Sequence, residues 1–301
     1  MKSKYAVLAL ILAVVGCMST AFAQVKYTFE AVNYPDDTFT QLLGINNGGA
    51  IAGYHGASTN KGFTYSLSSK TFTNENYPNS AQTQVIGING QGPFKTSGFY
   101  ITQGGATIGF TDVAGKFTSV AFPGMPFNQL LSQNNVGQAA GYFSTAADGS
   151  APDHAYVYDE IGGVFEEFFI PNSSGGAQAT GINNSGEVCG FFVDSKAINH
   201  GWVRMGGDFV ILNYPDSTGT QALGLNNENQ VVGSYTDAAG NSHGFVYNTS
   251  AKTWQEVNDP NGSDSTIVNG INDKGQLVGF YGMTASSQTT SFGFVATPQT
   301  E

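Results

Sequence analysis

Cysteine, charge and long apolar runs are all scarce in this chain of 301 residues. Its two cysteines, Cys17 and Cys189, cannot build a disulfide framework. Only 11% of the residues are charged and the net charge is −11, which argues against a nucleic-acid partner, because such a partner requires cations that neutralise phosphates. After the N-terminus, no run of 18 apolar residues indicates a transmembrane helix. No segment shows a sustained helical period with caps, so we expect an all-β protein.

The first residues have the pattern of an export signal. A basic start precedes an apolar run from Ala6 to Val15, and Ala21-Phe22-Ala23 forms a small-x-small cleavage site. Residues 1–23 are therefore predicted to be a signal peptide and residues 24–301 a single repeat domain. In a second interpretation, the segment that ends at Cys17 resembles the lipobox of bacterial lipoproteins, and Cys17 carries a lipid anchor. The first interpretation predicts a secreted protein, and the second predicts a protein that is lipid-anchored at the cell envelope.

One segment recurs six times in the sequence. Each copy approximates Thr-Gln-x-x-Gly-Ile-Asn-Asn, followed by a turn and an apolar stretch that ends in Gly and an aromatic residue. The copies are Gln41–Tyr54, Gln84–Tyr100, Gln129–Tyr142, Gln178–Phe191, Gln221–Tyr235 and Ile267–Tyr281. A period of about 45 residues is typical of propeller blades and solenoid units. The repeat therefore sets the architecture.

Each copy holds four short apolar segments separated by turn residues. In the fifth copy they are 220–225, 230–235, 243–247 and 253–257, and a proline ends the copy. Four strands per repeat fit a β-propeller, whose blades are four-stranded sheets, or an open β solenoid. The chain begins with Val25–Val32, which matches a fourth strand, and ends with Phe292–Ala296, which matches a third. We therefore predict a six-bladed β-propeller of four-stranded blades that is closed by the N-terminal strand.

The Gly-Ile-Asn-Asn-x-Gly turn and the downstream His-Ala/Gly-aromatic strand resemble the HAF-repeat family of extracellular bacterial proteins. The matching residues are Gly181–Gly186, Gly270–Gly275, His154–Tyr156, His200–Trp202 and His243–Phe245. The resemblance covers Val25 to Ala296, but the second copy has Pro93–Thr96 where an apolar strand is expected, and the third has Ser132-Gln133 in place of Gly-Ile. It implies a secreted, propeller-like repeat protein and brings no catalytic residues.

The six first strands would line the channel of a propeller, and they contain no Asp, Glu, His, Lys, Arg or Cys. Glycoside hydrolysis usually needs two opposed carboxyl groups, and acyl transfer needs a nucleophile beside a base. Gln begins five of these strands and Asn ends all six. These amides form a polar ring that binds a sugar or an ion, or they satisfy hydrogen bonds of the turns and between blades. The second interpretation is preferred, because the periodicity follows the fold.

The histidines and Cys189 favour structural roles. His154, His200 and His243 share one repeat position, but equivalent strands of neighbouring blades lie at least about 10 Å apart, too far for a shared zinc ion. Each is expected to bond its neighbouring blade or turn. His55 has no equivalent and is expected in a solvent-exposed loop. Cys189 stands where other copies have Ala or Val and is expected to be an inert core thiol.

The acidic pairs and the aromatic residues favour the same conclusion. Asp36-Asp37, Asp159-Glu160 and Glu166-Glu167 lack the spacing of a calcium loop and are expected in solvated turns. Recurrent aromatic rings would suit a carbohydrate platform, but their strand positions favour packing between blades. These rings belong to Tyr54, Tyr142, Tyr235, Tyr281, Trp202 and Trp254.

These patterns predict an exported binding or scaffolding module at or outside the cell surface. They point to no catalytic residue, cofactor or metal, and they leave the ligand open between an extracellular polysaccharide and a protein. The alternative is a carbohydrate-active enzyme whose residues lie in loops, with Thr145–Asp153 and Pro93–Thr96 as the places to look. The sequence identifies no ligand-binding residue.

Overall fold

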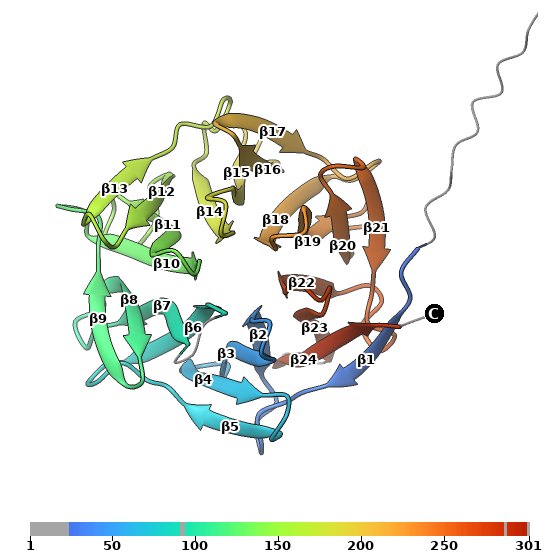
Figure 1. Ribbon diagram of the computed structural model, residues 1–301, viewed down its shortest axis with the longest axis horizontal. Helices are drawn as coiled ribbons and strands as arrows, with labels where there is room; N and C mark the ends of the chain where they lie inside the picture. The colour runs from blue at the N-terminus through green and yellow to red at the C-terminus, as the bar shows by residue number, and fades with distance from the viewer. Residues whose placement is uncertain (1–23, 91–93, 286–287, 300–301) are drawn as a thin grey trace, which may run out of the picture.

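The computed structural model describes residues 24–90, 94–285 and 288–299. The predicted signal peptide with Cys17, and Pro93, lie outside these ranges. The described residues form 24 strands and no helix, so they contain no helix that could cross a membrane. Consecutive strands form units of four that are arranged around a common axis, and the first strand of each unit is innermost (Figure 1).

The strands are numbered in chain order, and each unit holds one copy of the repeat. Unit 1 comprises β2 (Thr40–Ile45), β3 (Ala50–His55), β4 (Lys61–Ser66) and β5 (Thr71–Asn74). Unit 2 comprises β6 (Gln82–Ile88), β7 (Lys95–Ile101), β8 (Thr107–Val113) and β9 (Lys116–Val120). Unit 3 comprises β10 (Phe127–Gln133), β11 (Gln138–Ser144), β12 (Asp153–Asp159) and β13 (Val164–Glu167).

The second half of the chain repeats the same order. Unit 4 comprises β14 (Ala177–Ile182), β15 (Val188–Val193), β16 (Asn199–Met205) and β17 (Asp208–Leu212). Unit 5 comprises β18 (Gly219–Leu225), β19 (Gln230–Thr236), β20 (Ser242–Asn248) and β21 (Thr253–Val257). Unit 6 comprises β22 (Thr266–Ile271), β23 (Leu277–Ala285), β24 (Gln288–Pro298) and the N-terminal β1 (Tyr27–Ala31).

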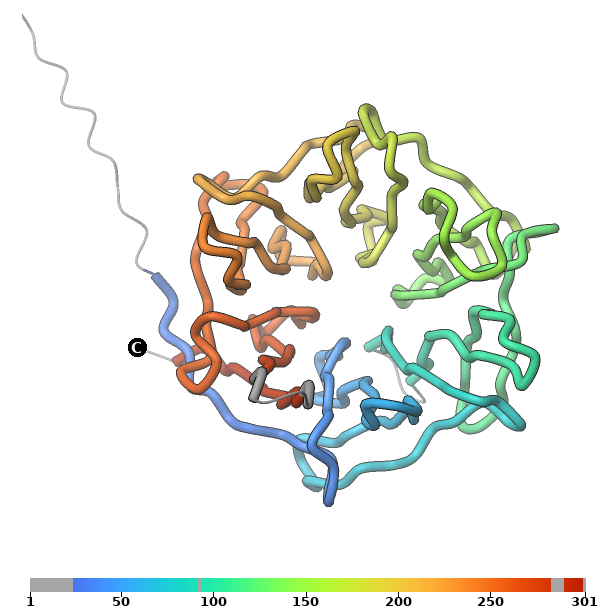
Figure 2. Tube along the Cα trace, turned by 180° about the vertical axis from the view of Figure 1, so that it is seen from behind, coloured from blue at the N-terminus to red at the C-terminus, as the bar shows by residue number. Residues whose placement is uncertain are grey.

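The N-terminal strand completes the last unit, as the sequence predicts. Strand β1 pairs antiparallel with β24, and Tyr27 lies opposite Pro298. Just after β1, the Val32 N–H donates to the Gly293 carbonyl at 2.9 Å. Figure 2 shows the first strand beside the last segments of the chain. The two ends of the described chain are therefore joined through backbone hydrogen bonds.

The sheets differ from the prediction in one respect. Four sheets have four strands, but units 2 and 3 share one sheet of eight. A single parallel pair, Phe127 with Thr107, joins β10 to β8. Similar parallel bridges link neighbouring units elsewhere, for example Phe39 with Ser291, but in each of them one residue, here Phe39, lies just outside a strand. The predicted four-stranded blades are therefore seen as separate sheets in four units, whereas units 2 and 3 form a single sheet, because there both bridge residues belong to strands.

The glycine of the repeat lies where the backbones of neighbouring units approach closely. Each first strand has a β-bulge, which in unit 1 lies between Leu42 and Gly44. A bulge changes the direction in which the following side chains point. A Cβ on Gly44 would lie 2.5 Å from the Ile86 carbonyl oxygen, and a Cβ on Gly224 would lie 2.5 Å from the Asn269 carbonyl oxygen. Only glycine permits this backbone approach.

The hydrophobic core is divided among the layers between consecutive units, which we call seams. The seam between units 6 and 1, for example, buries Val32, Ile51, Phe63, Val278 and Val295. Because each unit buries its faces against two neighbours, no unit has a core of its own. The described chain is thus an all-β, propeller-like fold.

Candidate functional site

The first strands enclose a central cavity of about 590 Å³. Its wall has three layers of side chains, which follow from the alternation of residues along each strand. The first layer is Gln41, Gln84, Gln129, Gln178, Gln221 and Ile267. The second is Leu43, Ile86, Leu131, Thr180, Leu223 and Asn269. The third is Asn46, Asn89, Asn134, Asn183, Asn226 and Asn272, and the cavity therefore combines amide groups with an apolar belt.

The buried Asn layer connects the units. In Asn226, Oδ1 accepts from the N–H groups of Glu228 and Gln230, both at 3.0 Å, and Nδ2 donates to the Asn272 carbonyl at 3.1 Å. The same link joins Asn134 to Asn183, Asn183 to Asn226, Asn272 to Asn46 and Asn46 to Asn89. These five amides hold their own turns and bond the next unit, so the preferred interpretation of the Asn positions is confirmed.

Asn89 is the exception in this layer. Its Oδ1 accepts from the Lys95 N–H at 2.8 Å. Among the described residues, no hydrogen bond runs from its amide to Asn134. The residue that follows Asn89, Gly90, has no side chain to accept a bond from unit 1, but its N–H donates to Asn135 Oδ1 of unit 3 at 2.8 Å. The buried series of Asn-to-carbonyl bonds is therefore open between units 2 and 3, although Gly90 and Asn135 bond the two units beside it.

An exposed outer ring lies beside the buried Asn layer. The N–H of Asn184 donates to Asn227 Oδ1 at 2.9 Å, and the N–H of Asn227 donates to Asp273 Oδ1 at 2.9 Å. Asp273 is the one charged residue among those lining the described cavity. Partial burial works to raise its pKa, but hydrogen bonds from Asn47 and Asn227 outweigh this effect and hold the pKa below its usual range. This mouth of the cavity therefore carries a single carboxylate.

The other two layers offer hydrogen bonds and apolar contact. Thr180 and Asn269 bond neighbouring carbonyls, with Thr180 Oγ1 2.9 Å from the Ala222 oxygen. Gln84 Nε2 donates to Asn60 Oδ1 at 2.8 Å, whereas the side chains of Gln129 and Gln221 have no partner among the described residues. No nucleophile beside a base lines the described cavity. Its side chains can bind a ligand, but they are not arranged for covalent or acid–base catalysis.

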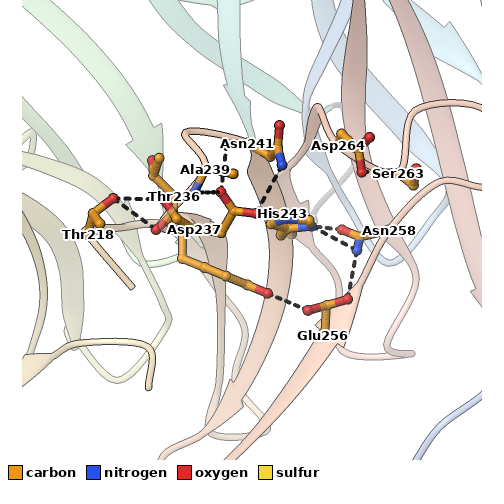
Figure 3. Close-up of polar contacts among 12 residues, drawn as sticks. Thr218, Thr236, Asp237, Ala239, Asn241, His243, Glu256, Asn258, Ser263 and Asp264 are labelled. Atoms are coloured by element: carbon orange, nitrogen blue, oxygen red, sulfur yellow. Dashed lines mark hydrogen bonds and ion pairs between the residues drawn. The ribbon is translucent and has the colours of Figure 1, made fainter. Parts of the chain in front are cut away.

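The three repeated histidines lie on separate units, each beside its own partners. His243 Nε2 is 3.3 Å from Asp237 Oδ2 in the preceding turn, and its Nδ1 is 3.1 Å from Asn258 Nδ2 (Figure 3). His200 is likewise 3.3 Å from Asp194 Oδ2 in its turn. The predicted contact with a turn is confirmed for these two. It is wrong for His154, whose Nδ1 is 2.8 Å from Glu167 Oε1 on the adjacent strand.

His55 departs from the prediction more clearly. It is the last residue of β3, its side chain is only 12% exposed, and its ring stacks on Tyr34 with centroids 3.5 Å apart. Its Nδ1 is 2.8 Å from Asp37 Oδ2. The prediction of an exposed loop is wrong, because His55 fills the position that Tyr100 and Tyr235 fill in other copies, where each ring stacks on an aromatic residue of the preceding linker.

Several acidic residues are also more enclosed than predicted. Asp37 bonds His55, Glu160 bonds Lys95, and Glu167 bonds His154, and all three carboxylates are half-buried. Glu166 is more exposed and pairs with Arg204 at 3.1 Å. The prediction of solvated turns is therefore wrong for Asp37, Glu160 and Glu167, because side chains from other segments bond and partly cover them. In the described chain, no three His, Cys, Asp or Glu side chains form a group that could hold a metal ion.

Cys189 and the aromatic residues have the predicted environments. Cys189 is fully buried, and burial raises the pKa of its thiol to about 12. Trp202 is fully buried, and the Tyr235 ring stacks on Tyr214 with centroids 3.7 Å apart. Tyr54 differs, because it lines the cavity and donates its hydroxyl to Gln41.

Sequence reasoning missed the polar residues between units 1 and 2, namely Glu75, Thr96 and Asp112. Thr96 donates its hydroxyl to Glu75, and Asp112 is only 6% exposed. A position-by-position alignment of all four strands of each copy would have found them, because Glu75 stands where Val32 and Val257 stand. The prediction had singled out Pro93–Thr96 as a departure, but not its partners.

Taken together, the fold and the cavity define a propeller-like repeat protein with an amide-lined central channel. No family model matches the chain, and no curated protein sequence matches it. The solved structure of AofleA from Arthrobotrys oligospora is similar, with 11% identity, a TM-score of 0.55, and coverage of 92% of this chain and 88% of that one.

Two further solved structures are similar. The Aleuria aurantia lectin, described as a six-bladed β-propeller with a novel fucose recognition mode, has 10% identity and a TM-score of 0.50 over 90% of this chain and 96% of its own. A chain of a nidogen/laminin complex has 11% identity and a TM-score of 0.52 over 77% and 84%. At these identities the similarity shows the fold alone.

Proposed function

We propose that this protein is a non-catalytic binding module on a six-bladed propeller and that its ligand enters the central channel. The observation that carries this proposal is the channel wall, where uncharged amides and apolar side chains surround about 590 Å³ and Asp273 is the single charged residue. Binding sites of this kind are concave, mostly apolar and equipped with a few convergent polar groups.

The six-blade count treats the eight-stranded sheet as two blades. Two observations support it. Units 2 and 3 each have the four-stranded order of the other units, and a single strand pair, Phe127 with Thr107, joins their sheets. The Aleuria aurantia lectin, which has a similar fold, is described as six-bladed.

The proposed ligand is a neutral polyhydroxylated molecule, such as a saccharide. Amides both donate and accept, so they suit hydroxyl groups, and the unpartnered side chains of Gln129 and Gln221 supply such groups without breaking a bond. The apolar belt, which includes Leu43 and Leu223, suits the C–H faces of a sugar ring. A strongly anionic ligand would meet no cationic side chain in the described wall.

The resemblance to the HAF-repeat family and the export signal support a place outside the cell. We propose secretion after cleavage at Ala23, with a lipid anchor on Cys17 as the alternative. Intact mass of the native product separates these outcomes. A mass that corresponds to Gln24–Glu301 supports secretion, and an added diacylglyceryl mass on Cys17 refutes it.

Binding is tested with a panel of purified polysaccharides and oligosaccharides. We expect retention of the wild-type protein on at least one neutral glycan and weaker retention of Gln129→Ala and Gln221→Ala, with unchanged melting temperatures. Gln103→Ala is the matched control, because Gln103 is an exposed glutamine in the turn between β7 and β8. Release of reducing ends would instead support the alternative of an enzyme with loop-borne residues, and no retention of any glycan would contradict the saccharide proposal.

A further inference from the structure

Each seam places three side chains at equivalent positions. The first is the residue three before the proline that ends a unit, and the other two lie on the second and third strands of the next unit. In the seam between units 6 and 1 these residues are Val32, Ile51 and Tyr65, which pack in one buried cluster. We call each such set a seam triplet.

Four other seams follow this apolar pattern. Leu212, Val231 and Tyr247 share one cluster, and Val257, Leu277 and Ala296 share another. The remaining triplets are Val120 with Ala139 and Tyr158, and Phe168 with Val188 and Arg204. Arg204 is the polar member of its triplet, but it still packs on an apolar group, since its guanidinium lies over the Phe168 ring at 4.6 Å. Contact between apolar groups is thus the rule at these positions.

The seam between units 1 and 2 has polar residues at all three positions of its triplet, namely Glu75, Thr96 and Asp112. The Glu75 N–H donates to the Gly62 carbonyl at 2.9 Å, which fixes Glu75 at the end of unit 1. The Thr96 hydroxyl donates to the Glu75 carboxylate, and Asp112 lies directly opposite Thr96 in the antiparallel pair of β7 and β8. Opposite residues in such a pair have Cβ atoms about 4.5–5.5 Å apart, so three oxygen-bearing side chains converge.

Asp112 has an unused oxygen in this seam. Its Oδ2 accepts from the Gly115 N–H at 3.2 Å. Its Oδ1 is buried and has no hydrogen-bond partner in the described chain. Buried carboxylate oxygens are costly to leave without a partner. The orphaned oxygen therefore points to a partner that the described residues do not supply.

The two carboxyl groups also lack a countercharge. No ion pair among the described residues includes Glu75 or Asp112, and the nearby Lys95 is bonded to Glu160. Burial raises the pKa of Glu75 to about 7, the bond from Thr96 works against this, and the charge of Asp112 adds to it. Burial also raises the pKa of Asp112. Without a cation, the pair therefore has to hold a proton near neutral pH.

We propose that Glu75, Thr96 and Asp112 form a site for a hard divalent cation, for which Ca²⁺ is the probe. All the side-chain donors are oxygens, two of them from carboxylates, and hard cations prefer such ligands. Ca²⁺ is favoured over Mg²⁺ because it tolerates irregular coordination, and the half-buried Glu75 leaves room for water ligands. On binding, the cation displaces the proton from the pair, and the bond from Thr96 to Glu75 is exchanged for coordination.

Calcium titration of the full chain tests the proposal. In weakly buffered solution at pH 7, Ca²⁺ at about 1 mM, the range of weak calcium modules, should release protons from the protein, because the cation displaces the proton that the buried pair holds. The proton release should vanish near pH 9, where Glu75 is already ionised. Binding to the folded state alone should also raise the melting temperature by about 2–4 °C.

Three variants separate this site from general charge effects. Glu75→Gln and Asp112→Asn should abolish both responses, whereas Asp148→Asn, at an exposed loop position, should keep both. The triple variant Glu75→Val, Thr96→Ile, Asp112→Tyr restores the triplet of the seam between units 6 and 1; it should fold and show no calcium response. The proposal is overturned if NaCl at equal ionic strength reproduces the rise in melting temperature, or if the triple variant still binds Ca²⁺.

Discussion

The side-chain amide of Asn272 donates to the backbone carbonyl of Asn46 at 3.1 Å, although the two residues are 226 positions apart in the chain. This bond joins the last unit to the first at the inner wall of the ring. Strand β1 joins the same two ends at the outer wall by pairing with β24. The ring is therefore closed both at its axis and at its rim.

We expect Asn226→Ala to lower the free energy of unfolding by about 2–4 kcal/mol, because it removes bonds to two turn N–H groups and leaves the Asn272 carbonyl without its donor. Asn89→Ala is the matched comparison and should cost less, since Asn89 accepts one N–H and makes no described bond to unit 3. Urea unfolding of both variants provides the measurement. Equal losses would contradict a role of the amides in joining the units.

Deletion of Val25–Val32 should open the last unit. The variant loses the pairing of β1 with β24 and the buried Val32, and it exposes the backbone of β24 as an unpaired edge. We expect a lower melting temperature and concentration-dependent aggregation, followed by light scattering and size-exclusion chromatography. A variant that stays monomeric and melts like the parent would show that the N-terminal strand is not needed for closure.

His200→Ala should lower the free energy of unfolding by about 0.5–1.5 kcal/mol, the range of one hydrogen bond. His200 is half-buried, with Nδ1 2.7 Å from Asn213 Oδ1 and its ring stacked on Phe192. His200→Gln, which can keep a bond to Asn213, should recover part of the loss. Thermal unfolding of the two variants measures both effects. An unchanged stability of His200→Ala would contradict a structural role for His200.

Asp237 should give the fold a stability that is lost in acid. The Asn241 N–H contributes most to holding the pKa of Asp237 at about 2, with help from the Asn241 side chain and His243, against an ordinary value of 3.8. Because the folded state lowers this pKa, the contribution is complete above about pH 4 and disappears as the pH falls through about 2. The melting temperature of the wild type should exceed that of Asp237→Ala at pH 6, and the difference should shrink below pH 4. A difference independent of pH would refute the charge-based account.

Cys189 should resist thiol reagents in the native protein, because it is fully buried and burial raises its pKa to about 12. We expect no reaction with Ellman's reagent until a denaturant unfolds the chain. The assay uses protein that begins at Gln24, so that Cys17 does not contribute. Rapid native labelling would show that the layer around Cys189 opens readily.

The sequence by itself determined the repeated unit and the way it closes. Its Asn and Gly turns define hairpins, and the offset between Val25–Val32 and Phe292–Ala296 requires the first strand to join the last unit. Local propensity and periodicity define the strands and hairpins, because these depend on residues only a few positions apart, and the repeat register at the two ends of the chain then defines the closure. The same regularity identified Cys189 as a core residue and the Asn layer as structural.

The tertiary structure decided what lies across the seams. From the sequence, His55 is an isolated histidine in a loop, whereas in the folded chain its ring stacks on Tyr34. Glu75 likewise has no apparent partner in the sequence, whereas in the folded chain it lies beside Thr96 and Asp112. Likewise, the single bridge between Phe127 and Thr107 merges two sheets, and the sequence of neither strand predicts this bridge. Burial and pKa depend on the neighbours that another unit brings, about 45 residues away in a repeat of this kind. The polar seam triplet can therefore be identified only in the folded structure.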